Sequence, residues 1–259
     1  MRRVQVAVVN ASHLADEDVA GGVGALQQQV RQDLAPVWDV DAELSLVTSE
    51  QAHAVGRYAH EAAEHPLDCA DRERWGLVLL DEGDTRRSAR GYHDRTYHGL
   101  PMARVLVDRL GAGQDWVHAA SHQLLELLVD PGCSAVAYRH PDAATVLFYA
   151  REICDPCGAY TDGYEKCGRW VSDFVFPSWF EPATAARNGH RRYDERGLVT
   201  EPFEVLPGGY VGVFDPAISA WVLQGSNAGS DEVTQVGSRM ERRSTASNRL
   251  LDSDMSTAP

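Results

Sequence analysis

The stretch DWVHAASHQLLELLVDP, residues 115–131, decides how the rest of the chain is interpreted. Its apolar residues recur at helical spacing and its closing Asp-Pro pair stops a helix, so the sequence predicts a helix over 115–129. His122, Glu126 and Asp130 follow one another four residues apart and share one face of that helix. A buried carboxylate costs several kcal/mol unless it is paired or bound to a cation. A divalent metal would satisfy His122 and Glu126 together, whereas a stripe that faces solvent would need none.

Upstream of this helix, short apolar runs alternate with helical patterns. The sequence predicts strands over residues 4–9, 42–47, 75–80 and 101–107, helices over 15–38 and 50–64, and a polar loop over 83–93. This alternation is typical of an α/β or α+β protein whose helices pack on a sheet.

Downstream of residue 131 the pattern degrades into short apolar runs between Gly- and Pro-rich turns. From residue 226 the composition becomes polar and poor in apolar residues. We therefore expect three parts: an N-terminal subdomain over 1–131, an irregular C-terminal subdomain over 132–225, and a polar, flexible tail over 226–259.

Charge and hydropathy exclude several functions. The 259 residues carry a formal net charge of −14, which argues against a nucleic-acid partner and against an anionic membrane surface. No run approaches the ~18 apolar residues that would span a bilayer. The apolar stretch near the N-terminus is too short for a signal peptide, so we expect a cytoplasmic protein.

The helix sequence HQLLE resembles the HExxH helix of the zincin metallopeptidases, in a variant whose second His is replaced by Glu. The resemblance is closer to bacterial zincin-like proteins that carry SHELxExxxDP on this helix and EIxD further on. The matching residues here are Ser121 to Glu126, Val129 to Pro131, and Glu152 to Asp155. The resemblance covers roughly residues 1–180 and implies a zincin-like mixed, twisted sheet with a metal-site helix.

By position, the resemblance implies that His122 and Glu126 are helix-borne zinc ligands, with another divalent metal as the alternative. The third ligand would be Glu152, Asp155 or Asp130, and the spacing does not separate these three.

Gln123 departs from the family pattern. In a zincin, the residue after the first His is the Glu that acts as general base on the metal-bound water. An amide cannot take that proton, and losing a general base typically costs on the order of 10² to 10⁴ in rate. We predict, in decreasing order, a metal-binding pseudoenzyme, an enzyme with another carboxylate as base, or an engineered inactivating change at Gln123.

Two classes of function follow. The first is a zincin-fold metal-binding protein, catalytically impaired, that holds a peptide or protein in extended form along an edge strand expected within 91–107. The second is a structural or interaction protein of a larger assembly, such as a phage particle or injection machine, that retains a degenerate metallopeptidase fold. The polar tail favours the second class, because such segments often order only against a partner. In that case the protein would be virion-associated.

Other metal-ligating residue types give weaker signals. The cysteines after the metal helix contain one CxxC pair, and we interpret them as buried small side chains rather than as a zinc site or disulfide. They are Cys133, Cys154, Cys157 and Cys167. His93 and His98 lie on a Tyr-rich loop, where packing is favoured over metal binding.

Overall fold

The computed structural model describes most of the chain. The described residues are 2–54, 74–81, 90–95, 99–181, 192–227 and 230–236. Residues 55–64 of the helix predicted over 50–64, and His98, lie outside them. Within the described residues, no helix is long and apolar enough to cross a membrane.

The N-terminal half forms a five-stranded mixed sheet with the strand order β2-β1-β3-β5-β4. Its strands are β1 (Arg2–Ala11), β2 (Val40–Val47), β3 (Trp75–Leu80), β4 (Gly91–Arg95) and β5 (Pro101–Leu106). The first four in spatial order are parallel, and β4 pairs antiparallel with β5 at the edge. The inner strands β3 and β5 are buried along most of their length because both faces of the sheet are covered there, as parallel sheets require.

Alternate residues of β1 show the two covered faces. Val6 and Val8 belong to the main core, whereas Ala7 and Val9 belong to a smaller apolar cluster on the other face. Ala52 of α3 (Ser49–Ala54) completes that smaller cluster.

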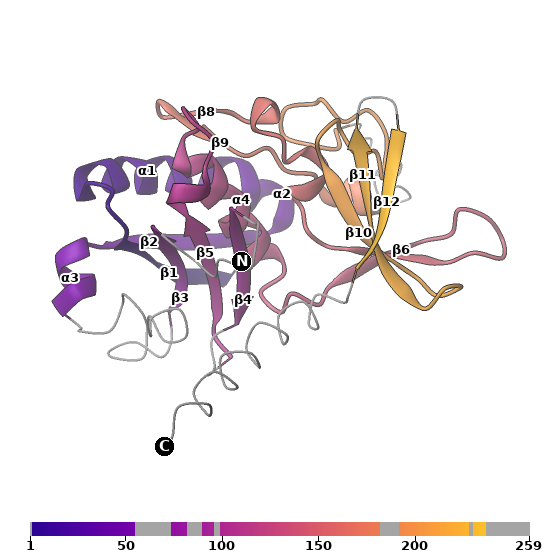
Figure 1. Cartoon of the computed structure of the whole chain (residues 1–259), viewed down its shortest axis with the longest axis horizontal. Helices are drawn as coiled ribbons and strands as arrows, with labels where there is room; N and C mark the ends of the chain where they lie inside the picture. Colours follow the sequence, from indigo (N-terminus) through magenta and orange to yellow (C-terminus); the bar gives the residue numbers. More distant parts are fainter. Residues whose placement is uncertain are drawn as a thin grey trace, which may run out of the picture.

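The main face is covered by two long helical segments (Figure 1). The first runs through α1 (Asp16–Gln29), a π-helical turn η1 (Val30–Leu34) and α2 (Ala35–Trp38). The second is α4 (Trp116–Val129), which follows the 3₁₀ turn η2 (Val107–Arg109) and packs on β4 and β5. The helix predicted over 115–129 is confirmed, with Asp115 as its N-cap.

The C-terminal half forms a second five-stranded sheet, fully antiparallel, with the order β12-β11-β10-β7-β6. Its strands are β6 (Val136–Arg139), β7 (Leu147–Ala150), β10 (Tyr210–Asp215), β11 (Ala220–Asn227) and β12 (Ser230–Val236). It stands beside the first sheet in Figure 1. Shorter elements connect the two halves: η3 (Asp155–Cys157), η4 (Tyr160–Asp162), β8 (Tyr164–Lys166), β9 (Arg169–Val171) and α5 (Pro177–Phe180).

The coarse class, a mixed α+β protein, agrees with the sequence analysis, but three details differ. The loop predicted over 83–93 extends too far, because its last three positions belong to β4, which begins at Gly91. The part predicted to be irregular, 132–225, contains most of the second sheet. The tail predicted from residue 226 begins too early, because β12 pairs with β11 as far as Val236. Backbone pairing needs an apolar face on one side only, so a polar segment can form such a strand.

Candidate metal centre

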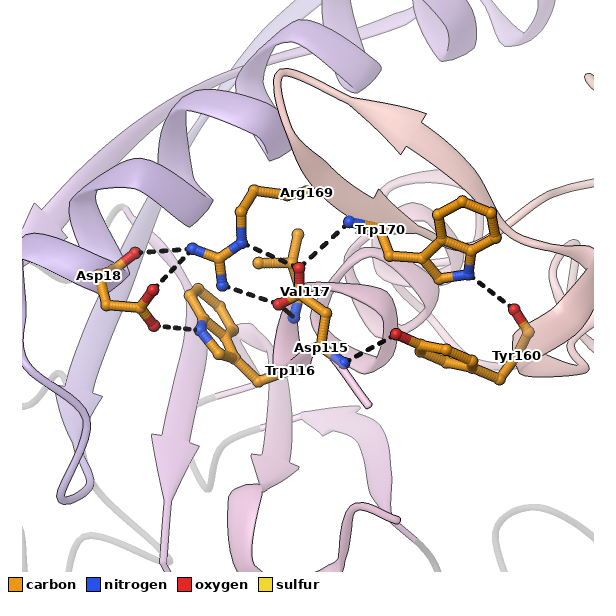
Figure 2. Close-up of polar contacts among 7 residues, drawn as sticks. All are labelled: Asp18, Asp115, Trp116, Val117, Tyr160, Arg169 and Trp170. Atoms are coloured by element: carbon orange, nitrogen blue, oxygen red, sulfur yellow. Dashed lines mark hydrogen bonds and ion pairs between the residues drawn. The ribbon is translucent and has the colours of Figure 1, made fainter. Parts of the chain in front are cut away.

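The N-terminus of α4 is fixed by a polar network (Figure 2). The Asp115 carboxylate accepts the Val117 amide at 3.1 Å, as an N-cap does, and accepts two bonds from Arg169 at 2.7 and 2.9 Å. Arg169 also donates to Asp18 of α1 at 2.8 Å, and the indole of Trp116 donates to the same carboxylate at 2.7 Å. The network therefore joins α4 to α1 and to the β8–β9 hairpin, and this sets the position of the polar face that lies about two to three turns further along α4.

Three sequence-predicted ligands converge on that face. The Nε2 atom of His122 lies 3.4 Å from Oε1 of Glu126, one turn along α4, and 3.1 Å from Oδ1 of Asp155. One ligand atom from each residue lies within 4.8 Å of the other two. The side chains of Glu126 and Asp155 are each 3% exposed and that of His122 is 14% exposed. The arrangement is a nearly enclosed set of one nitrogen and two oxygen donors.

Two close approaches bring Asp155 to the helix. A Cβ on Gly158 would lie 3.2 Å from the His122 ring, so η3 packs directly on that imidazole. On its other side, a Cβ on Gly209 would lie 2.4 Å from the carbonyl oxygen of Pro156. Glycine at 209 therefore lets the second sheet press the η3 turn against α4.

Two buried carboxylates beside one imidazole repel each other when both are ionised. Burial and the neighbouring charge of Glu126 raise the pKa of Asp155. Burial lowers the pKa of His122, but Glu126 and Asp155 outweigh it and raise that pKa well above its usual value. A divalent cation would neutralise the pair and replace the water that burial removes. The donor set therefore fits a metal ion, and a mixed nitrogen and oxygen set is one that zinc accepts.

Tyr210, at the start of β10, is a site residue that the sequence analysis did not identify. Its hydroxyl hydrogen-bonds to Asp155, and this carboxylate together with burial raises the pKa of Tyr210 well above its usual value. The residue as a whole is 41% exposed, so its ring borders the surface while its hydroxyl is enclosed. The Gly-Gly-Tyr sequence indicated only a turn into a strand, because nothing local shows that β10 packs on η3.

His93, on the edge strand β4, also reaches this centre, although packing was the favoured interpretation. Its Nδ1 atom lies 3.2 Å from Oε1 of Gln123 and 3.5 Å from Oε2 of Glu126. Burial lowers the pKa of His93, but the Cys133 sulfur and the Glu126 carboxylate outweigh it and raise that pKa to about 9.

Gln123 lies between α4 and the edge strand. A Cβ on Gly91 of β4 would lie 3.0 Å from Cγ of Gln123, and the Gln123 carbonyl faces His93. The side chain at the position of the zincin general base is thus in contact with β4 in this structure.

Two sequence-predicted ligands lie outside the group of three. Asp130 ends α4, and its Oδ2 accepts the Ala135 amide at 2.9 Å, which stabilises the turn after the helix. Glu152 is partly exposed and acts on Asp155 through its charge, which raises the pKa of Asp155 further. His118, one turn before His122, packs on Tyr160 with ring centroids 4.9 Å apart, and burial lowers its pKa to about 3.

The four described cysteines are free. Cys133, Cys154 and Cys157 are buried and Cys167 is exposed. Cys154 and Cys157 belong to the main core, which agrees with the interpretation of the cysteines as small buried side chains, but that interpretation is wrong for the exposed Cys167.

A second group of ligand types lies beyond the carboxyl ends of β1, β3 and β5. His13 Nδ1 lies 2.7 Å from Asp81 and 3.7 Å from Asp108. The three side chains are between 42% and 62% exposed. Water can solvate these charges, so the group does not require a metal.

No family model, no curated protein and no solved structure matches this chain. The geometry of the site and the motif residues are therefore the basis on which a function can be proposed.

Proposed function

We propose that this chain is a metal-binding protein with a zincin-like architecture and impaired peptidase activity, and that His122, Glu126 and Asp155 hold the metal. The observation that carries the proposal is the convergence of these three side chains, with both carboxylates almost fully buried. Zinc is the proposed ion, and harder divalent metals are alternatives because two of the three donors are carboxylate oxygens.

The arrangement of the first sheet supports the zincin-like part of the proposal. The helix that carries the HQLLE motif packs on β5 and on the antiparallel edge strand β4. An edge strand beside the centre could accept an extended peptide or protein by strand addition.

The residues of this chain define what chemistry the site could perform. A bound metal would polarise a carbonyl and acidify a water. Tyr210 would orient Asp155 through its hydroxyl. Gln123 could hydrogen-bond a water but could not deprotonate it, so the proposed activity is a trace of hydrolysis at most.

A second candidate function, a structural or interaction protein of a larger assembly, is favoured by a different observation. Val136 and Tyr138, two residues apart on the edge strand β6, are 39% and 67% exposed. Apolar side chains on one face of an edge strand are suited to a protein partner.

The decisive experiment measures metal content and hydrolysis together. We expect the purified protein to bind one zinc ion. Glu126→Gln should bind zinc at least ~100-fold more weakly, because losing a ligand costs more affinity than losing an outer hydrogen-bond partner of a ligand. Casein and a peptide library are then assayed with the wild type and with Gln123→Glu. Chelator-sensitive activity that appears only in Gln123→Glu would support a zincin-like site that lacks its general base in the wild type.

Each other outcome has a distinct meaning. Strong chelator-sensitive activity in the wild type would contradict the pseudoenzyme and require another base. Zinc binding with no activity in either protein would favour the assembly role. No zinc binding by the wild type would contradict the proposed centre.

A further inference from the structure

We propose that His93 is a positioning residue that holds Glu126 in its ligating orientation from the edge strand β4. The inference rests on the proposed metal centre and adds a residue that the motif resemblance does not include. It connects the outermost strand of the first sheet to a ligand on α4.

The two oxygens of Glu126 face different partners. Oε1 faces Nε2 of His122 at 3.4 Å and accepts the Cys154 amide at 3.3 Å. Oε2 faces Nδ1 of His93 at 3.5 Å, and the same Nδ1 atom lies 3.2 Å from the Gln123 carbonyl oxygen, so its N–H is shared between the two oxygens. One oxygen is thus directed toward the metal centre, and the other is directed toward the edge strand.

His93 is itself held in place. It pairs with Ala103 of β5 in the sheet, its residue is 6% exposed, and the Cys133 thiol contacts its carbonyl oxygen at 3.9 Å. Gly91, two residues earlier, lets β4 approach the Gln123 side chain closely. A buried ring on a paired strand can act as a support for Glu126, because its backbone position is set by the sheet.

The physical reason for the role is the cost of leaving a buried carboxylate oxygen without a partner. When the imidazole N–H is removed, Glu126 is expected to rotate or take up a proton, and either change withdraws it from a metal. Outer hydrogen-bond partners of metal ligands typically contribute 10- to 100-fold to metal affinity.

The test compares zinc affinity, by competition with a chromophoric chelator, in four proteins. These are the wild type, His93→Phe, His93→Asn and His118→Phe. Phe keeps a ring but has no N–H, whereas the Asn amide can place an N–H near the position of Nδ1. His118 is a matched control, because it is buried to a similar degree and packs on Tyr160.

We expect His93→Phe to bind zinc roughly 10- to 100-fold more weakly, and His93→Asn to recover most of that loss. His118→Phe should keep wild-type affinity. The visible spectrum of bound Co²⁺ should change in His93→Phe and not in His118→Phe, even when their metal-free melting temperatures fall equally. A purely structural role would change the melting temperature alone.

The outcomes separate this inference from the metal centre. Equal zinc affinity in His93→Phe and the wild type would overturn the positioning role and leave the centre intact. A wild type that binds no zinc would overturn both. A loss in His93→Phe that His93→Asn does not recover would also contradict the hydrogen bond as its cause.

A measurement on the wild type covers the case in which His93→Phe does not fold. In protein labelled with ¹⁵N-histidine, we expect the Nδ1 of His93 to remain protonated after zinc is added, while His122 shows the nitrogen shift of a metal ligand. A metal-type shift at His93, or loss of its Nδ1 proton, would overturn the inference.

Discussion

In the part of the chain that the structure describes, two pairs of buried carboxylates have different surroundings. Glu126 and Asp155 share the Nε2 atom of His122 at the candidate metal centre. Asp173 and Asp194, both fully buried, hydrogen-bond to each other in the segment that links the two sheets. Burial alone therefore does not identify a metal site, because one chain buries acids in two ways.

The difference lies in the hydrogen-bond donors. Oδ1 of Asp173 accepts the amides of Phe174, Glu195 and Arg196 at 2.8, 3.2 and 3.3 Å, and Asp194 accepts the Leu198 amide at 2.8 Å. Burial and the neighbouring Asp194 raise the pKa of Asp173 to about 9, so the pair retains one proton.

Backbone amides bond to one oxygen of each acid in this linking pair. The remaining oxygens, Asp173 Oδ2 and Asp194 Oδ1, have no other partner among the described residues, and one shared proton would satisfy both without a cation. At the metal centre, imidazole nitrogens take the place of most of those amides. The comparison indicates that an imidazole nitrogen next to buried carboxylate oxygens favours a metal, whereas a pair of buried carboxylates alone does not.

The largest effect is expected from Asp173→Ala. Removing this carboxylate takes away the acceptor of the buried Phe174 amide and of the Arg196 amide, and leaves the Glu195 amide only its bond to the Phe174 carbonyl. It also leaves Asp194 without its proton partner. We expect a loss of about 4 kcal/mol in the free energy of unfolding, measured with urea. A loss below about 1 kcal/mol would mean that water or a rearranged loop replaces the carboxylate.

A smaller effect should separate the two pairs by metal addition. Zinc at about 100 times its dissociation constant should raise the free energy of unfolding by about 2.7 kcal/mol in the wild type. Asp155→Asn should lose this gain, and Asp173→Asn should keep it. Equal loss in both variants would contradict the assignment of separate roles.

The pH dependence of stability gives the next effect. The folded protein keeps a proton on Asp173 up to about pH 9, whereas the unfolded chain releases it near the usual Asp pKa of about 3.9. This contribution to stability is complete below about pH 4 and is lost as pH rises toward about 9.

In Asp173→Asn, the side-chain amide carries N–H hydrogens that do not titrate between pH 5 and 8. The free energy of unfolding of this variant, measured between pH 5 and 8, should therefore fall less steeply than that of the wild type, by up to about 1.4 kcal/mol per pH unit. Identical slopes would show that the pair does not share a proton.

The smallest effect is expected at the exposed group around His13. His13→Ala should leave both the zinc stoichiometry and the melting temperature unchanged within error, because exposed ion pairs contribute little. A fall in bound zinc from two ions to one would show that this group also binds metal.

The sequence by itself determined much of the N-terminal half. Apolar runs predicted β3 at residues 75–80, and helical spacing with an Asp-Pro stop predicted α4. These are local patterns, so they can be read without knowing which segments meet. The i, i+4 spacing also brought His122 and Glu126 to one helix face.

Only the tertiary structure decided which other residues join them. Asp155 reaches His122 because Gly158 and Gly209 allow η3 to pack between α4 and the second sheet, and spacing had left it equal to Asp130 and Glu152. His93 and Tyr210 come from strands of two different sheets, 29 and 88 positions from His122 in the numbering of the chain. Contacts across such separations depend on how sheets and helices pack, and no local periodicity in a single sequence records that packing.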